Sequence, residues 1–274
     1  MKLFWVYVLL AFLPGCLPFF AISQIYTGPL GSVSNGFLFD AVYLGNSKNL
    51  KFYHNRQRQY GTVELVSMLK SVSSELSLKF DDNIIMLGDM SGKHGGHISG
   101  HASHRAGMDV DVAFFVRDLK KGSDTFDRLN RYDRFGVTLD DSGVKMFDYE
   151  KNWAFVEACL KNTDWEVQWI FVSKGLKAAM LRWALANGRD LEVIYKAAHI
   201  LHQPSDSSPH NDHFHVRVYC PGVSLDNRGQ GCRQRRPVWE WVEQKFLQRG
   251  NCKFNDCNSV LSDDDIMKMA LDGL

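Results

Sequence analysis

Two histidine-rich stretches are the feature that most constrains this chain. Seven of the ten histidines lie within residues 88–111 and 210–215, namely His94, His97, His101, His104, His210, His213 and His215. Asp109 and Asp111 close the first stretch. Histidine is the commonest metal ligand in proteins, and a hydrolytic zinc takes three protein ligands and keeps one position open. The sequence therefore predicts a metal site that joins two segments distant in the chain.

Spacing within each stretch narrows the choice of ligands. His213 and His215 are two residues apart on a predicted strand, so both side chains project from one face. His104 and Asp111 are seven residues apart, which lets a loop histidine fold back onto a strand carboxylate. One histidine of the second stretch can then bind the metal while the other meets the water or the substrate.

Two alternatives stay open at this stage. Asp109 and Asp111 share a strand face, so either can supply the carboxylate ligand, although we expect Asp109 to be a supporting carboxylate. His101 and His104 can both reach a metal if their loop is tight. Glycines before and after these histidines allow the backbone to approach a metal or substrate closely.

The N-terminal residues are typical of a secretory signal. Lys2 precedes an apolar run over residues 3–13, and small residues follow, so we expect a signal peptide over residues 1–21 and a mature domain over residues 22–274. A lipoprotein signal ending at Cys16 is the competing interpretation. The net charge of +1 and the lack of a basic block argue against nucleic acid as a partner.

An exported protein can keep disulfides. After Cys16, five cysteines remain, and the simplest pairing joins Cys220 to Cys232 and Cys252 to Cys257. This pairing leaves Cys159 free inside a predicted helix. Spacing alone does not determine the connectivity.

Hydrophobic periodicity predicts several helices and strands. We expect helices over residues 62–78 (capped by Thr62), 148–161, 174–186 and 191–201, and a helical tail over 237–248 and 262–271. We expect strands over residues 83–87, 108–116, 167–172 and 214–219, loops and short strands over 22–59, and an irregular insertion over 120–142.

At this level of detail the residues resemble a known family. His101-Ala-Ser-His104-Arg-Ala-Gly-Met-Asp-Val-Asp111, together with His210-x-x-His213-x-His215, is similar to motifs of the penicillin-insensitive murein endopeptidases. These enzymes belong to the group of zinc peptidases that includes lysostaphin and the D-Ala-D-Ala dipeptidases. The resemblance runs from about residue 26 to about residue 235, without a match over 120–147 or in the tail after Arg236.

The resemblance implies a fold, a site and a reaction. The implied fold is α+β, with a small antiparallel sheet that carries the zinc site and is flanked by helices. The implied zinc ligands are His104, Asp111 and His215, with His101 as an additional metal ligand. His213 matches the catalytic histidine, and His210 matches an accessory histidine of the active site. The implied reaction is hydrolysis, in the periplasm, of D-alanyl to diaminopimelyl cross-links between peptidoglycan stem peptides.

Other functions are weighed beside this one. A non-catalytic protein of the same fold that binds cell wall or metal, and a zinc D,D-carboxypeptidase or dipeptidase, use the same residues. A serine DD-peptidase is suggested by Ser67-Met-Leu-Lys70, but its K-T-G partner motif is absent from the sequence. The lack of an H-E-x-x-H motif argues against a thermolysin-like mechanism.

Overall fold

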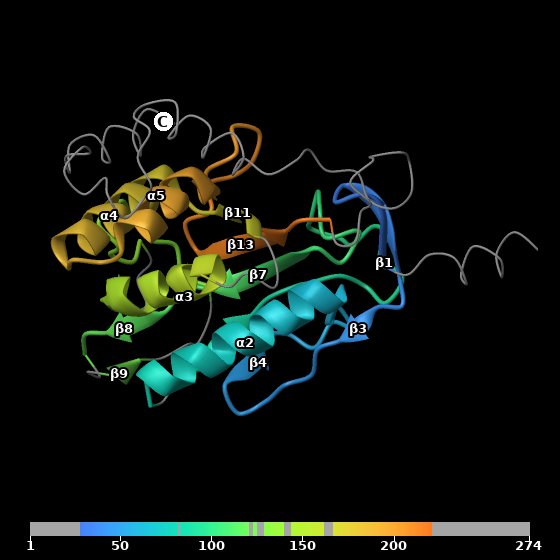
Figure 1. The fold of residues 1–274 in the computed structure, drawn as a ribbon, viewed down its shortest axis with the longest axis horizontal. Helices are drawn as coiled ribbons and strands as arrows, with labels where there is room; N and C mark the ends of the chain where they lie inside the picture. The colour runs from blue at the N-terminus through green and yellow to red at the C-terminus, as the bar shows by residue number, and fades with distance from the viewer. Residues whose placement is uncertain are drawn as a thin grey trace, which may run out of the picture.

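The computed structural model describes residues 28–81, 83–120, 123–124, 129–139, 144–161 and 167–220 (Figure 1). The helices are α2 (Val63–Lys79), α3 (Tyr149–Lys161), α4 (Lys174–Ala186) and α5 (Leu191–Ile200). The strands are β1 (Gly28–Ser32), β2 (Asn35–Phe39), β3 (Val42–Tyr43), β4 (Leu50–Phe52), β5 (Tyr60–Gly61), β6 (Ile85–Leu87), β7 (Asp109–Ala113), β8 (Val116–Asp118), β9 (Ser123–Asp124), β10 (Lys145–Phe147), β11 (Val167–Phe171), β12 (Leu201–His202) and β13 (His213–Val218).

The main sheet has six strands in the order β12-β11-β13-β7-β6-β4. Its four central strands pair antiparallel, but β12 runs parallel to β11 and β4 runs parallel to β6. The expected α+β fold is present, whereas the expected small antiparallel sheet is larger and mixed. The parallel pairs arise from the connections between the strands. Helices α4 and α5 link β11 to β12, and α2 lies between β4 and β6. Helical crossovers of this kind return a strand parallel to its partner.

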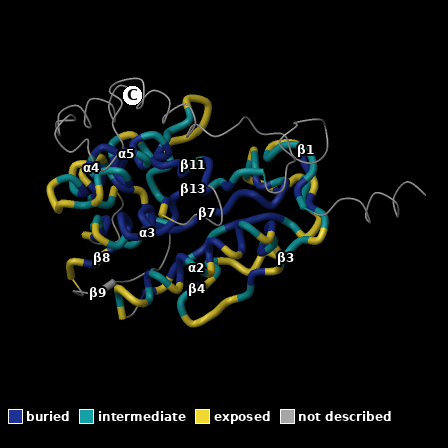
Figure 2. Tube along the Cα trace, in the orientation of Figure 1, coloured by how far each residue is buried: buried dark blue, intermediate teal, exposed yellow. Residues whose placement is uncertain are grey.

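Helices cover one face of this sheet. Figure 1 shows α2 and α3 side by side over the strands, with α4 and α5 beside α3. Phe214 of β13 stacks on Phe155 of α3 with ring centroids 5.7 Å apart, and Val216 is fully buried on the same face. Because successive side chains of a strand alternate, His213 and His215 point to the opposite face. β7 and β13 are among the most buried segments in Figure 2.

Local sequence signals placed the helices well. The Thr62 hydroxyl accepts a hydrogen bond from the backbone N–H of Leu65 at 3.2 Å, so the predicted N-cap of α2 is confirmed. Helix α4 begins and ends at the predicted residues, and α5 begins with Asp190 as its cap. No helix among the described residues is long and apolar enough to cross a membrane.

Two predicted segments differ from the structure. The strand predicted over 108–116 is divided into β7 and β8, with Phe114 and Phe115 between them. The insertion over 120–142 is less irregular than expected in its described parts, since β9 pairs with β8 and Tyr132 bridges Thr138. Backbone hydrogen bonding, which apolar periodicity does not report, organises this segment.

Several predictions lie outside the described residues. These are the signal segment and the two C-terminal helices. Each predicted cysteine pair also includes at least one residue beyond Cys220, so the pairing stays a prediction. Cys159 is free and buried in α3, as expected.

Candidate metal centre

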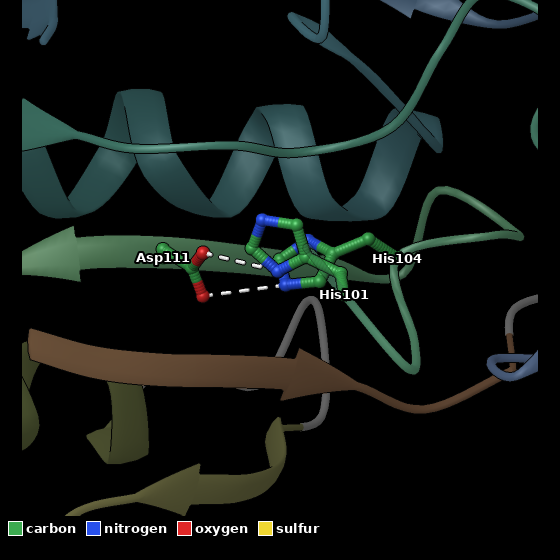
Figure 3. Close-up of side chains that lie close together, drawn as sticks. All are labelled: His101, His104 and Asp111. Atoms are coloured by element: carbon green, nitrogen blue, oxygen red, sulfur yellow. Dashed lines mark ion pairs between the residues drawn. The ribbon is translucent and has the colours of Figure 1, made fainter. Parts of the chain in front are cut away.

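Three segments bring the candidate site together on the face of the sheet opposite the helices. β7 and β13 pair so that Asp111 lies opposite His215 and Asp109 lies opposite Arg217. The loop before β7 adds His101 and His104, and Figure 3 shows both imidazoles directed at Asp111. The predicted meeting of the two histidine stretches is therefore present in the structure.

His104 reaches the site through an unusual backbone conformation. Its φ is +63°, in the left-handed region that residues other than glycine rarely adopt. The backbone N–H of His104 donates to Asp109 Oδ2 at 3.0 Å, and Nδ1 lies 2.9 Å from the Met90 carbonyl oxygen. The side chain is fully buried. Strained conformations of this kind persist at functional sites when the surrounding contacts determine them.

Gly107 lets the histidine loop pack closely against the β1–β2 hairpin. Gly107 has φ +72°, and a Cβ placed there would lie 2.4 Å from Cδ2 of the buried Leu38. Gly96 also has a positive φ, +78°, but a Cβ there would meet nothing within 4 Å. A substitution at Gly96 therefore tests backbone strain alone, whereas a substitution at Gly107 adds steric overlap with Leu38.

We predict that Gly107→Ala destabilises the protein more than Gly96→Ala. Left-handed strain costs both variants about 1–2 kcal/mol. Overpacking against Leu38 adds about 1–3 kcal/mol in the Gly107 variant only. Denaturant unfolding of the two variants checks this difference, and equal losses of stability would show that the hairpin does not press on the loop.

Three candidate ligand atoms form a small triangle. His104 Nε2, Asp111 Oδ1 and His215 Nδ1 are separated by 3.3 Å (His104 to Asp111), 3.2 Å (His215 to Asp111) and 3.3 Å (His104 to His215). Ligand atoms about 2.0–2.1 Å from a tetrahedral metal lie about 3.3–3.4 Å from one another. The triangle therefore has the size of one face of a tetrahedral zinc site.

Outer hydrogen bonds orient the two histidines of this triangle. His215 Nε2 lies 3.1 Å from Asp109 Oδ1, and His104 Nδ1 faces the Met90 carbonyl. Both outer acceptors lack protons, so each outer nitrogen must donate. In the neutral form each inner nitrogen then carries a lone pair that points at Asp111.

Asp111 is the group that most requires a cation. Its Oδ1 is buried and accepts no hydrogen bond from the described residues, although three imidazole nitrogens lie 3.2–3.5 Å away. Burial alone would raise the pKa of Asp111, but His104 and His213 hold it well below its usual value. A buried ionised oxygen that faces the lone pairs of His104 and His215 fits a divalent metal. These residues therefore fit zinc.

His101 lies at the edge of the triangle. Its Nδ1 is 3.7 Å from Asp111 Oδ2, and its Nε2 is 3.0 Å from Asp89 Oδ2. Asp89 also accepts a hydrogen bond from Arg58 at 2.7 Å. His101, His104 and Asp111 each offer one ligand atom within 4.8 Å of the others, which makes them a possible metal-binding group.

His213 and His210 flank the triangle on the side of β13. His213 Nε2 lies 3.5 Å from Asp111 Oδ1, and its Nδ1 is 2.7 Å from Asp212 Oδ1. Burial alone would lower the pKa of His213, but Asp111 and Asp212 raise it to about 10. Burial lowers the pKa of His210 to about 4, and His213 adds to this effect. A cation bound to Asp111 would offset part of this rise in the pKa of His213, whereas Asp212 would sustain the rest.

Sequence reasoning left two carboxylates of the site without a role. Asp89 and Asp212 each hold the outer nitrogen of one histidine, at 3.0 Å and 2.7 Å. Their position beside the histidine motifs was the available signal.

By contrast, His94 and His97 are exposed, and so are Ser67 and Lys70 on α2. Because Ser67 and Lys70 are exposed to solvent, they give no support to a serine DD-peptidase.

Comparisons with known proteins agree with these motifs. The sequence profile of a family described as penicillin-insensitive murein endopeptidase matches residues 29–256 of the chain. Relatives with this description occur in Escherichia coli O157:H7, Escherichia coli K12 and Shigella boydii serotype 18. Each is 29% identical over 220 residues, which cover 77% of this chain and 75% of the relative. The match extends past Arg236 and spans the insertion, beyond the resemblance found by motif alone.

Proposed function

The chain belongs to the penicillin-insensitive murein endopeptidase family, and we propose that it is a zinc-dependent enzyme that hydrolyses D-alanyl to diaminopimelyl cross-links between peptidoglycan stem peptides. The observation that carries the zinc dependence is the triangle of His104 Nε2, Asp111 Oδ1 and His215 Nδ1. Two imidazole nitrogens and one carboxylate oxygen form a donor set typical of catalytic zinc. We propose these three residues as the zinc ligands.

The role of His101 in this site is separate from that of the triangle. We propose it as an additional metal ligand, since its Nδ1 lies near Asp111 and its other nitrogen is held by Asp89. Its side chain is partly exposed, unlike that of His104, so it stands where the site opens to solvent. At this edge of the site, His101 can bind the metal or be displaced from it by water or substrate.

The chemistry divides between the metal and the neighbouring histidines. A bound Zn²⁺ would act as a Lewis acid and lower the pKa of a water ligand to about 7. His213 presents Nε2 toward the same point as the ligand atoms, and Asp212 holds its other nitrogen. A charged His213 can orient the reacting groups and donate a hydrogen bond to the oxyanion that forms at the scissile carbonyl. We propose His213 as the catalytic histidine.

His210 completes the proposed catalytic group. Its ring centroid lies 5.5 Å from that of His213 and 5.9 Å from that of His215. The Ser173 N–H donates to the His210 carbonyl at 2.7 Å, and the His210 N–H donates to Gln203 Oε1 at 2.9 Å, so the backbone is held on both sides. A neutral imidazole in this place can accept a proton from the reacting groups.

The substrate implies a location. Peptidoglycan lies outside the cytoplasmic membrane, and residues 1–21 have the pattern of an export signal. We propose that the mature protein acts in the periplasm, either free or anchored by a lipid on Cys16.

The decisive experiment is digestion of purified cross-linked muropeptide dimers, analysed by mass spectrometry. We expect conversion of dimers to monomers that a chelator abolishes, that added zinc restores, and that penicillin does not affect. Release of D-alanine from uncross-linked stem peptides in place of dimer cleavage would favour a D,D-carboxypeptidase. Zinc binding without turnover of either substrate would favour a non-catalytic protein that binds cell wall or metal.

A further inference from the structure

A buried carboxylate outside the triangle links both histidine stretches. Asp109 is fully buried, and its two oxygens accept from three groups. Oδ2 accepts the backbone N–H of His104 at 3.0 Å, while Oδ1 accepts the ring N–H of His215 at 3.1 Å. Oδ1 also accepts from Arg217 Nε at 2.6 Å. One side chain thus holds the backbone of one proposed ligand and the ring of another.

Arg217 is the counter-charge of this carboxylate. It lies directly opposite Asp109 in the β7–β13 pairing, and its guanidinium carbon is 5.2 Å from the centre of the Phe171 ring. Its side chain is only 15% exposed. Asp109 and Arg217 therefore form a largely buried ion pair, and removal of one charge leaves the other uncompensated.

We propose that Asp109 is a positioning residue that sets the ring orientation of His215 and the left-handed conformation of His104, so that both inner nitrogens face Asp111. This inference rests on the proposed zinc site. Asp109 does not face the triangle itself, because both of its oxygens are engaged by other donors. Loss of such outer partners typically lowers metal affinity about 10- to 100-fold.

The test separates positioning from simple stability through two variants. Asp109→Asn keeps the size of the side chain but leaves one acceptor oxygen, so it cannot hold both His104 and His215. It also leaves Arg217 without a counter-charge. The double variant Asp109→Asn/Arg217→Gln removes both charges and should recover most of the denaturation midpoint that the single variant loses.

Zinc affinity gives the contrasting readout, measured by competition with a chromogenic chelator. We expect a roughly 10- to 100-fold loss in the single variant, and we expect the double variant to remain as weak although its stability returns. Asp148→Asn is the matched control, because Asp148 is also a buried aspartate that pairs with an arginine, Arg117, and accepts a backbone N–H, that of Lys151. It should lower the midpoint and leave zinc affinity unchanged.

The outcomes distinguish failure of this inference from failure of the proposed zinc-dependent function on which it rests. Zinc affinity that recovers together with stability in the double variant would mean that Asp109 is structural only, and would overturn the inference alone. Absence of zinc binding by the unmodified chain would overturn the zinc-dependent function and the inference together. Should neither variant fold, imidazole NMR of the zinc-loaded unmodified protein decides, since fast solvent exchange of the His215 Nε2 proton would show that Asp109 does not hold the ring and would overturn the inference alone.

Discussion

Replacement of His215 by alanine is expected to weaken zinc binding strongly and to reduce cross-link cleavage with it. His215 Nδ1 lies 3.2 Å from Asp111 Oδ1 and 3.3 Å from His104 Nε2, so the variant loses one corner of the triangle. A zinc binding free energy of about 10–16 kcal/mol shared by four ligands corresponds to roughly 3 kcal/mol each, or about a 100- to 1,000-fold loss of affinity. Bound zinc after dialysis and turnover of muropeptide dimers are the two measurements.

His202→Ala is the control for this variant. His202 lies on β12, at the edge of the same sheet, and packs near Trp169 and Phe171 without belonging to the triangle. It should keep the metal and most of the activity. If His215→Ala retained stoichiometric zinc at unchanged affinity, the ligand assignment would be wrong, and His101 would be the residue to test next.

His213→Ala is expected to keep most of the bound zinc and to lose turnover. Its Nε2 is 3.5 Å from Asp111 Oδ1, farther than the nitrogens of His104 and His215 in the triangle, and its Nδ1 lies 2.7 Å from Asp212 Oδ1. Groups that transfer protons or stabilise charge in the transition state typically contribute about 100- to 10,000-fold to the rate. The loss should therefore appear in kcat at saturating substrate, with zinc content close to that of the unmodified protein.

The comparison of His213→Ala with His215→Ala is the most discriminating measurement in this test. Both histidines project from the same face of β13, two residues apart, and both are largely buried. A general disturbance of the strand would affect them alike. Loss of zinc from His213→Ala, or full activity of that variant, would contradict its assignment as the catalytic histidine.

Local signals explain why the helices and the histidine strand were predictable. The Thr62 cap, the apolar spacing of α4 and the alternation around Phe214 and Val216 each depend on residues within a few positions. The sheet edges were not predictable in the same way. Strands as short as β4 and β12 carry little periodic signal, and their parallel pairing depends on the crossovers through α2 and through α4 and α5.

The arrangement of the insertion also came from contacts that no local pattern reports. The Tyr132 N–H donates to the Asn211 carbonyl at 2.8 Å, and the Asn211 side chain donates to the Tyr132 carbonyl at 3.3 Å. These bonds attach the insertion to the segment that carries His210 and His213. Their partners are far apart in the sequence, so the pairing exists only in the folded chain.

The sequence by itself determined the chemistry of the site, because residue types and short spacings identify histidines and carboxylates that share a face. Strand spacing left Asp109 and Asp111 equivalent, since both occupy the same face of one strand, and the family resemblance favoured Asp111. The register between β7 and β13 gives the physical reason for their different roles, because it sets Asp111 opposite His215 and Asp109 opposite Arg217. The ion pair with Arg217 turns Asp109 away from the triangle, and Asp111 is left as the carboxylate that faces the inner nitrogens. A register is a contact between distant segments, so tertiary structure alone could decide it.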